Sequence, residues 1–275
     1  MKLKNVIHQL TSQSHSQMMS YVIETKDNQI IVIDGGTNND AAYLLDYIRN
    51  LKGGKTHINA WILTHVHNDH VGAIMECYRN HSSEFTVDAV YYNFPPAELV
   101  DTCEGEHGQS DFFNFTHHFA DITHTLKEND LLDFGEIKFK VLYTADFTII
   151  NNFINNTSTV LKMFADGQTM IFLGDLGIEG GNILLERHYD ETQSDFVEMA
   201  HHGQNGVTFD VYKAINPKVC FWDTPLWLWN NDAGKGYNTH VWQTVIVQGW
   251  MNELGVKHHF VTKDGTNVIG LPYEH

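Results

Sequence analysis

Three observations predict an α/β fold in a single domain. Apolar segments with strand-like alternation and segments with helical spacing follow one another along all 275 residues. No Pro-, Gly- or Ser-rich linker and no low-complexity tract separates them. The stretch "AWILTHVHNDHVGAI", residues 60–74, connects a short apolar strand to a helix through three histidines and one aspartate. We therefore expect residues 1–275 to form one domain that contains both kinds of secondary structure.

The first part of the chain is expected to alternate strands and helices. Apolar content and alternation predict strands at 20–25, 29–36, 60–64 and 87–93. Apolar residues at helical spacing predict a helix at 41–51, after the capping sequence "TNND", and a second helix through "HVGAIMECYRN". Residues 94–130 are rich in Phe and His, and we expect an irregular insertion there with a helix near 110–126.

The second part of the chain continues this mixture. Strands are expected at 137–144, 158–165, 169–175, 195–200 and 219–223. Helices are expected near 181–189, 211–215 and 240–254. A hairpin around "KDGT", residues 263–266, is expected to close the chain.

The charge and cysteine content restrict the classes of partner and compartment. The formal net charge is −17 and no patch or stripe of Lys and Arg is visible, so we expect a small-molecule substrate rather than a polynucleotide. No apolar run approaches the roughly 18 residues of a membrane span, and the first residues lack the apolar region of a signal peptide. Cys77, Cys103 and Cys220 have no C-x-x-C spacing, which fits reduced thiols in a cytoplasmic protein. The oligomeric state stays open.

The cluster after residue 64 predicts a metal site. His65, His67, Asp69 and His70 offer imidazole and carboxylate, the ligands that a catalytic zinc-type ion binds. His65 and His67 follow a strand and point the same way, whereas Asp69 and His70 come at the start of the next helix and approach from another direction. Four ligands at this spacing can serve two ions side by side. The alternative is a histidine-rich loop that is merely solvated.

The order T-H-x-H-x-D-H between a strand and a helix resembles the signature of the metallo-β-lactamase superfamily. The resemblance implies a four-layer αββα sandwich and extends to "IIVIDGG" with Asp34, to "IFLGD" with Asp175 as the bridging aspartate, and to "VEMAHHG" as the source of the last histidine. From this pattern we expect His201 to be a metal ligand and His202 a neighbour that orients it or the substrate. A plain turn or helix-cap role for Asp175 is the alternative.

One departure from the family pattern points to a particular branch. No histidine occurs between His124 and His188, where most members place another ligand. Instead "NNTSTVL" resembles the N-x-S-x-V pattern of the branch that includes the hydrolase domain of the bacterial competence DNA-uptake channel and the teichoic-acid phosphorylcholine esterase. This resemblance implies that Asn156 and Ser158 lie close to the metals and contact the substrate. A polar loop in an Asn-rich protein is the alternative.

We expect two divalent ions, zinc or manganese, with unequal occupancy. The ion held by His65 and His67 would have only two imidazoles, the shared Asp175 and solvent. The other ion would have four ligands, supplied by Asp69, His70, Asp175 and His201.

The expected activity is hydrolysis by a metal-bound hydroxide, most readily of a phosphodiester or related phosphoester. Asp69 would orient the hydroxide, and His202 or His240 would serve as the general acid. Hydrolysis of a lactone, thioester or amide is the alternative, because a resemblance of fold does not separate these substrates. A non-hydrolytic metal-binding or redox protein is disfavoured, since redox relatives with a di-iron site typically carry Glu where this chain has His67.

Tryptophans in "CFWDTPLWLWNN" are candidate substrate contacts. Trp222 and Trp227 could form a pocket wall for a flat or cationic group, because tryptophan faces attract cations. The plainer interpretation is core packing together with an apolar lid or interface.

Overall fold

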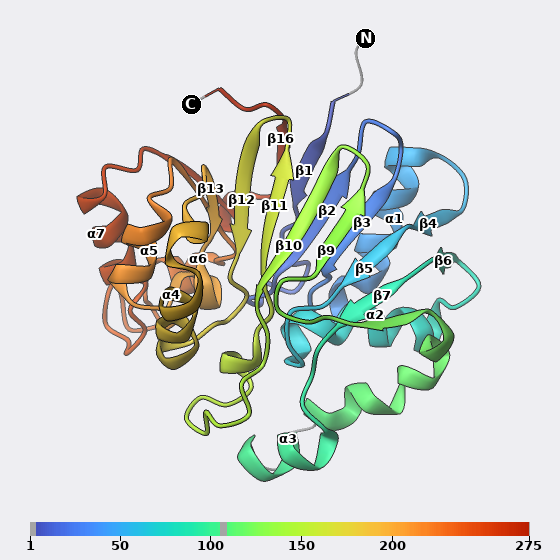
Figure 1. The fold of residues 1–275 in the computed structure, drawn as a ribbon, viewed down its shortest axis with the longest axis horizontal. Coiled ribbons are helices and arrows are strands. Elements are labelled where there is room, and N and C mark those ends of the chain that lie inside the picture. The colour runs from blue at the N-terminus through green and yellow to red at the C-terminus, as the bar shows by residue number, and fades with distance from the viewer. Residues whose placement is uncertain (1–3, 105–108, 275) are drawn as a thin grey trace.

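The computed structural model describes residues 4–104 and 109–274. Two seven-stranded sheets lie face to face, and helices cover the outer face of each sheet (Figure 1). The apolar core accordingly divides into one layer between the sheets and two layers between a sheet and its helices. This is the αββα sandwich, so the fold expected from the sequence is confirmed.

The first sheet has the strand order β16-β1-β2-β3-β5-β7-β8. Its strands are β1 (Val6–Gln9), β2 (Ser20–Glu24), β3 (Ile30–Asp34), β5 (Ala60–Ile62), β7 (Val90–Tyr92), β8 (Thr123–Thr125) and β16 (Asn267–Gly270). Pairing is antiparallel from β16 to β3 and parallel from β3 to β8.

The second sheet has the strand order β15-β14-β13-β12-β11-β10-β9. Its strands are β9 (Leu131–Phe134), β10 (Ile137–Tyr143), β11 (Val160–Ala165), β12 (Gln168–Phe172), β13 (Phe196–Glu198), β14 (Val219–Trp222) and β15 (His258–Val261). Pairing is antiparallel from β9 to β12 and parallel from β12 to β15. A separate parallel pair is formed by β4 (Thr56–Ile58) and β6 (Phe85–Val87).

The helices are divided between the two sheets (Figure 1). They are α1 (Ala41–Lys52), α2 (Asn68–Asn80), α3 (Ala97–Glu104), α4 (Ile178–Thr192), α5 (Phe209–Ile215), α6 (Leu226–Trp229) and α7 (Thr244–Glu253). Apolar residues of α1 and α2 pack on the first sheet, and those of α4, α5 and α7 pack on the second. None of the helices within the described ranges is both long and apolar enough to cross a bilayer.

Strand β3 shows why these segments form buried strands. Ile31 and Ile33 point into the layer between the sheets, while Ile30 and Val32 point toward α1 and α2. Because both faces of the strand are covered, the segment is a continuous apolar run instead of an alternating one.

Both sheets direct the carboxyl ends of their parallel strands toward one edge of the molecule. In the first sheet Asp34 ends β3, and Thr64 lies two residues beyond the end of β5. In the second sheet Asp175 follows β12 and His201 follows β13. Side chains at these strand ends contact one another across the sheets, as the 3.7 Å approach of His65 Nε2 to Asp175 Oδ2 shows. The candidate site therefore lies at this shared edge.

Two expectations about local structure were wrong. The helix expected near 110–126 is a series of short 3-10 turns, Gln109–Asn114, Thr116–His118 and Ala120–Ile122, followed by β8. Phe112 and Phe119 are buried in this segment and pack in the core that covers the first sheet. The closing hairpin is also absent from the described residues, because β15 pairs with β14 in the second sheet and β16 pairs with β1 in the first.

Small helical and strand segments were not anticipated. Strands β1, β4 and β9 and helix α3 lie in stretches where no element was expected. Further 3-10 turns are Asn38–Asp40, Asn155–Thr157, Ala200–Gly203 and Thr262–Asp264.

We expect a large loss of stability when Gly203 is replaced by Ala. Gly203 has φ +78° and a Cβ there would lie 2.4 Å from Cε3 of the buried Trp222. Gly167 has nearly the same φ, +79°, with nothing within 4 Å, so Gly167→Ala is a matched control for the backbone strain. Both variants should lose about 1–2 kcal/mol to the left-handed backbone, and Gly203→Ala about 1–3 kcal/mol more from overpacking. Urea unfolding midpoints measure the difference, and equal losses would contradict the packing argument.

Candidate metal centre

Six acidic and imidazole side chains converge at the shared edge of the sheets. Ligand atoms of the first group lie within 4.8 Å of one another, and this group consists of Asp69, His70, Asp175 and His202. A second group at the same separation consists of His65, His67 and Asp175. Asp175 belongs to both groups, as a residue that bridges two ions must.

The first half of the chain supplies His65, His67, Asp69 and His70, which lie in the turn after β5 and in the first turn of α2. The carboxylate of Asp34 accepts hydrogen bonds from the backbone N–H and the hydroxyl of Thr64, each at 2.7 Å. These bonds fix the direction in which the chain leaves the strand. Helix α2 then begins at Asn68, and a Cβ on Gly72 would lie 2.6 Å from the backbone nitrogen of Asn38. The close packing at Gly72 therefore holds the start of α2 in place.

Asp34 also orients His70. Its Oδ2 lies 2.7 Å from Nδ1 of the buried His70 ring. The opposite nitrogen, Nε2, is left facing Oδ1 of Asp175 at 3.1 Å. Burial by itself would lower the pKa of His70, but the carboxylates of Asp175 and Asp34 outweigh it and raise the pKa well above its usual value. A carboxylate behind an imidazole is the usual arrangement around a metal-binding histidine.

Asp175 is held from the protein side by two neighbouring elements. Its backbone N–H donates to Oγ of Ser158 at 3.0 Å. The two residues before it, Leu173 and Gly174, donate their backbone N–H groups to Oε2 of Glu198 at 2.8 and 2.9 Å. The turn that presents the Asp175 carboxylate is therefore fixed by hydrogen bonds on both sides.

The Asp175 carboxylate lies close to four imidazoles. Its oxygens are 3.1 Å from His70, 3.5 Å from His202, and 3.7 Å from both His65 and His201. Burial raises the pKa of this carboxyl, and the surrounding histidines, His202 and His70 first, outweigh that effect and hold the pKa well below its usual value. Asp175 is therefore ionised.

The adjacent histidines of the "HHG" turn take different positions. Both have left-handed backbones, with φ +54° at His201 and +56° at His202. Such a conformation costs about 1–3 kcal/mol for a residue other than Gly, so the surroundings must hold it. The N–H of His201 donates to the carbonyl of Gly174 at 2.8 Å, and the hydroxyl of Thr224 donates to the carbonyl of His202 at 2.6 Å. Strained, well-anchored turns of this kind cluster at functional sites.

His202, not His201, completes the first group. Nε2 of the buried His202 lies 3.2 Å from Oδ2 of Asp69, whereas the His201 side chain is 18% exposed and its Nδ1 lies 3.2 Å from the carbonyl oxygen of Asn205. The expected assignment, His201 as ligand and His202 as its neighbour, is therefore reversed by the geometry. Two identical residues side by side gave no sequence signal for this choice, because the left-handed turn decides which ring points inward.

The donor set fits divalent cations. Nε2 of His70 and Nε2 of His202 are buried and have no hydrogen-bond partner among the described residues, although carboxylate oxygens lie 3.1–3.2 Å away. Buried polar atoms without partners are uncommon in folded proteins and call for an explanation. Nitrogens and carboxylate oxygens that converge without hydrogen bonds are the arrangement that a bound cation would satisfy.

The second group has a smaller donor set. Nε2 of His65 lies 3.0 Å from Nδ1 of His67, and burial lowers the pKa of His65 well below its usual value. Within the described residues no third imidazole joins this group. Asp146 does not join it either; its carboxylate accepts hydrogen bonds from the N–H and hydroxyl of Thr148.

Asn156 and Ser158 support the site from behind. The amide oxygen of Asn156 accepts the N–H of Gly180 at 2.9 Å, and its nitrogen donates to the carbonyl of Asn151 and to Glu179. The bonds to Gly180 and Glu179 fix the start of α4 and the bond to Asn151 fixes the preceding loop, so the structure gives Asn156 a structural role where substrate contact was expected. Ser158 lies next to the centre, where its hydroxyl positions the N–H of Asp175.

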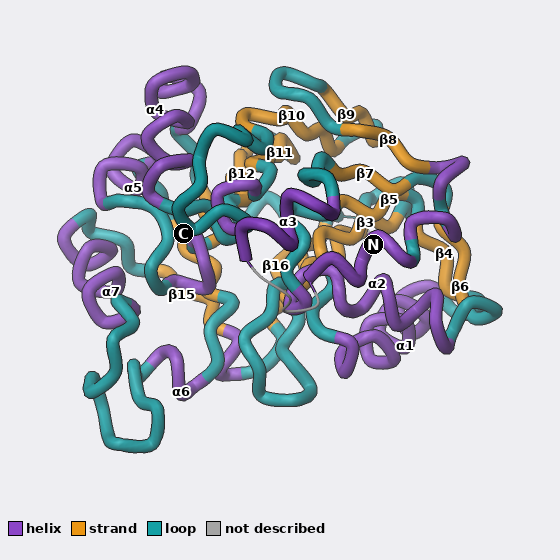
Figure 2. Tube along the Cα trace, turned by 90° about the horizontal axis from the view of Figure 1, so that it is seen from below, coloured by secondary structure: helices purple, strands orange, loops and turns teal. Residues whose placement is uncertain are grey.

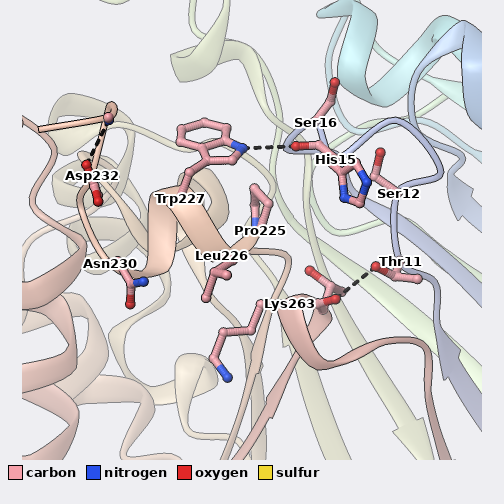
Figure 3. A pocket seen from close by; sticks show the side chains of 12 residues that line it. Thr11, Ser12, His15, Ser16, Pro225, Leu226, Trp227, Asn230, Asp232 and Lys263 are labelled. Atoms are coloured by element: carbon pink, nitrogen blue, oxygen red, sulfur yellow. Dashed lines mark hydrogen bonds between the residues drawn. The ribbon is translucent and has the colours of Figure 1, made fainter. Parts of the chain in front are cut away.

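The remaining predicted residues lie outside the two groups. Trp222 is fully buried and packs against Trp229 in the core, which corrects its expected place in a pocket wall. His240 is exposed and its ring packs against that of Trp242 in a tilted arrangement, with the ring centroids 3.8 Å apart. In the described residues no hydrogen bond or ion pair of its side chain joins it to the centre. Trp227 does line a cavity (Figure 3).

Sequence reasoning missed several supporting residues. Gln17, in the loop between β1 and β2, donates to Oδ2 of Asp69 at 3.1 Å and accepts from Gln204 at 3.1 Å. Its loop position carried no signal. Glu198 and Asp223 are almost completely buried carboxylates at the ends of apolar strands, and an acid within "DFVEMA" or directly after "VCFW" is a signal that could have found them.

Comparisons with known proteins agree with this geometry. The family model described as the metallo-beta-lactamase superfamily matches residues 16–132, and no curated protein matches the chain. The structure is similar to the metallo-beta-lactamase fold protein YhfI from Bacillus subtilis, with a TM-score of 0.59, 12% identity, and coverage of 97% of this chain and 99% of that one. It is also similar to CmlA, a diiron beta-hydroxylase from Streptomyces venezuelae, with a TM-score of 0.57, 12% identity, and coverage of 98% of this chain and 54% of that one.

At these identities the similar structures establish the fold alone. The family match covers the segment that contains His65, His67, Asp69 and His70. Over that segment the chain is similar to the metallo-beta-lactamase superfamily, and the structure has the fold of that superfamily.

Proposed function

We propose that the protein is a metal-dependent hydrolase of a phosphodiester or related phosphoester. The observation that carries the proposal is the pair of donor groups that share Asp175, with ligand atoms within 4.8 Å in each group. One ion would be held by Asp69, His70, Asp175 and His202, and the other by His65, His67 and Asp175. When bound, such ions lower the pKa of a water molecule to near 7 and stabilise the charge that develops on the attacked oxygen.

The chain itself would position water and substrate. The Asp69 side chain is 19% exposed, so it faces the solvent side of the centre, and Gln17 holds its Oδ2. Burial raises the pKa of Asp69, but the imidazoles of His202, 3.2 Å away, and His70 outweigh burial and hold that pKa well below its usual value. Asp69 is therefore ionised and can orient an attacking water by accepting its hydrogen bond.

His201 is the candidate proton donor to the leaving oxygen. It is the partly exposed imidazole beside Asp175, whereas His202 is buried among the carboxylates and His240 contacts Trp242. A general acid must reach the leaving group without being enclosed by the ligands. The geometry thus supports His201 in the role that the sequence suggested for His202 or His240.

One feature supports a phosphoester over a carboxylic ester or amide. A pair of metal ions suits an in-line displacement at phosphorus but serves amide hydrolysis as well, so the metal pair does not decide between these substrates. The segment around Asn156 and Ser158 resembles the phosphoesterase-containing branch of the superfamily. The net charge of −17 favours a small diester over a polynucleotide.

We expect the two ions to leave unequally during dialysis against a weak chelator. The group of His65, His67 and Asp175 offers one ligand residue fewer than the other group, so its ion should dissociate first. Elemental analysis during dialysis should pass through a stage with about one ion per chain. Loss of both ions in parallel would show that another residue completes the weaker group.

We expect the affinity for zinc to rise with pH. In the metal-free protein the carboxylates of Asp175 and Asp69 outweigh burial and raise the pKa of His202 to about 10. An imidazole must lose its proton to bind a metal. Below pH 10, each imidazole that releases a proton on binding should therefore raise the zinc affinity roughly tenfold for every unit by which the pH rises. Competition with a chromophoric chelator from pH 6.5 to 8.5 measures this slope, and His202→Asn should reduce it by about one proton.

The same raised pKa has an effect on the metal-free fold. Because the folded pKa lies above that of the unfolded chain, the protonated His202 contributes stability fully below about pH 6.5, and this contribution is lost as the pH rises through 10. Metal-free protein should therefore unfold at lower urea concentration at pH 9.5 than at pH 6.5. A zinc affinity that does not change with pH would contradict the raised pKa of His202, on which the affinity and the stability expectations both depend.

The reaction is tested by comparing bis(p-nitrophenyl) phosphate with a lactone and a thioester under matched zinc or manganese. We expect turnover of the diester. Asp175→Ala should lower metal content and rate together, because both groups lose a ligand. Asp69→Asn keeps the size of the side chain but loses its charge, so it should lower the rate by roughly a hundredfold, as is typical for a group that positions the reacting atoms.

Paired histidine variants provide the control. His201→Ala should lower the rate while leaving the ion content unchanged, whereas the exposed His240→Ala should change neither. Fast lactone or thioester cleavage without diester turnover would leave only a metal-dependent hydrolase, and a rate insensitive to Asp175→Ala would remove the proposed centre altogether.

A further inference from the structure

A cavity of about 620 Å³ opens at the edge of the molecule that carries the metal centre (Figure 3). Its walls come from the loop after β1, from the segment that follows β14 and from the turn after β15. The volume lies within the range of about 300–1,000 Å³ that is typical of small-molecule sites.

Both main walls of the cavity continue directly into residues that hold the centre. Ser16 lines the cavity, and the next residue, Gln17, donates to Asp69. Pro225 lines the opposite wall, and the residue before it, Thr224, donates to the carbonyl of His202. Consecutive Cα atoms are about 3.8 Å apart, so the cavity adjoins the centre on both sides.

One side of the cavity is apolar. Pro225, Leu226 and Trp227 line it, and the Leu226 side chain is 60% exposed, so its apolar surface is available to a ligand. The indole N–H of Trp227 donates to the carbonyl of His15 at 2.9 Å, as Figure 3 shows. The ring of Trp242 lies 4.9 Å from that of Trp227 and supports it from another side. Trp227 is therefore a fixed aromatic wall.

The charged residues of the cavity already have partners. Nζ of Lys263 lies 2.7 Å from both carboxylate oxygens of Asp264. Oδ1 of Asp232 accepts the backbone N–H groups of Gly234, Lys235 and Gly236 at 2.7–2.9 Å. Because Lys263 and Asp232 already have partners within the protein, the cavity does not need a charged ligand, and we infer that its ligand is uncharged.

Two polar side chains that line the cavity have uncommitted hydrogen-bonding groups. In the described part of the chain, the ring nitrogens of His15 and the side-chain amide of Asn230 have no hydrogen-bond partner, and the hydroxyls of Ser12 and Ser16 bond only within the serine-rich loop. An apolar aromatic wall beside such groups suits a flat ring whose edges donate and accept hydrogen bonds.

We propose that this cavity binds a neutral heteroaromatic ring carried by the substrate, while the adjoining centre holds the phosphoester. The inference rests on the proposed function, because that function places the reacting phosphoester bond at the metal centre. The ring contacts Leu226 and Trp227 on one side and hydrogen-bonds to the His15 side of the cavity with its edge.

Calorimetric titration of the protein, residues 1–275, with four phosphate-free probes tests the proposal. The probes are adenosine (a neutral heteroaromatic ring), choline (a cation), benzoate (an anion) and methyl glucoside (neutral but not flat). We expect adenosine to bind with a dissociation constant of about 1 mM or tighter and the others to bind more weakly. Tighter binding of choline, benzoate or the glucoside, or no binding of adenosine, overturns the proposal. None of the probes carries the reacting group, so this outcome is independent of whether the diester is hydrolysed.

A charge introduced on the apolar wall locates the binding site. Leu226→Asp should weaken adenosine binding by roughly tenfold or more, because it places a carboxylate against the ring. The matched control is Ile246→Asp on α7, which changes a leucine-like side chain of similar exposure, 53%, that does not line the cavity. Equal affinities of the two variants would show that adenosine binds elsewhere. Should Leu226→Asp lose its far-ultraviolet circular dichroism, Trp227→Ala replaces it with the same expected loss of affinity.

Discussion

The buried carboxylate of Asp175 is the point on which the rest of the structure depends. It lies between histidines from both halves of the chain. His65 and His70 follow β5 of the first sheet, and His201 and His202 follow β13 of the second sheet. An ionised carboxylate that is 2% exposed is costly unless cations or hydrogen-bond donors surround it. The packing of the two sheets brings these partners within 3.1–3.7 Å, so the fold and the centre stabilise each other.

Polar residues behind the centre hold the candidate metal ligands in the directions that they take. Asp34 orients His70, Ser158 orients Asp175, and Glu198 holds the turn before Asp175. Burial and the neighbouring Asp223 raise the pKa of Glu198, while the pKa of Asp223 is raised to about 7, mainly by burial. Two acids placed this close inside the protein are tolerated because backbone N–H groups, Tyr21 and Gln9 donate to them.

Under the proposed function, the loops at the same edge would contact both the reacting bond and the rest of the substrate. Gln17 belongs to the segment that limits the cavity, and it also holds Asp69, the acid on the solvent side of the centre. A ligand that moves this segment would therefore move Asp69 as well. Figure 2 shows this edge of the molecule from below, with α6 among the labelled segments. The segments proposed to bind the substrate and the residues proposed to hold the metal ions thus belong to one set of loops.

The sequence by itself determined the fold class, most of the larger elements and the cluster from His65 to His70, because apolar periodicity and ligand spacing are local properties of the chain. The tertiary structure decided what depends on direction and distance. It placed His202 rather than His201 among the carboxylates through a left-handed turn, buried Trp222 in the core, and split the closing strands between two sheets. It also brought Gln17 to Asp69, 52 residues away, a contact that exists only because packing of the sheets fixes the loops at their shared edge.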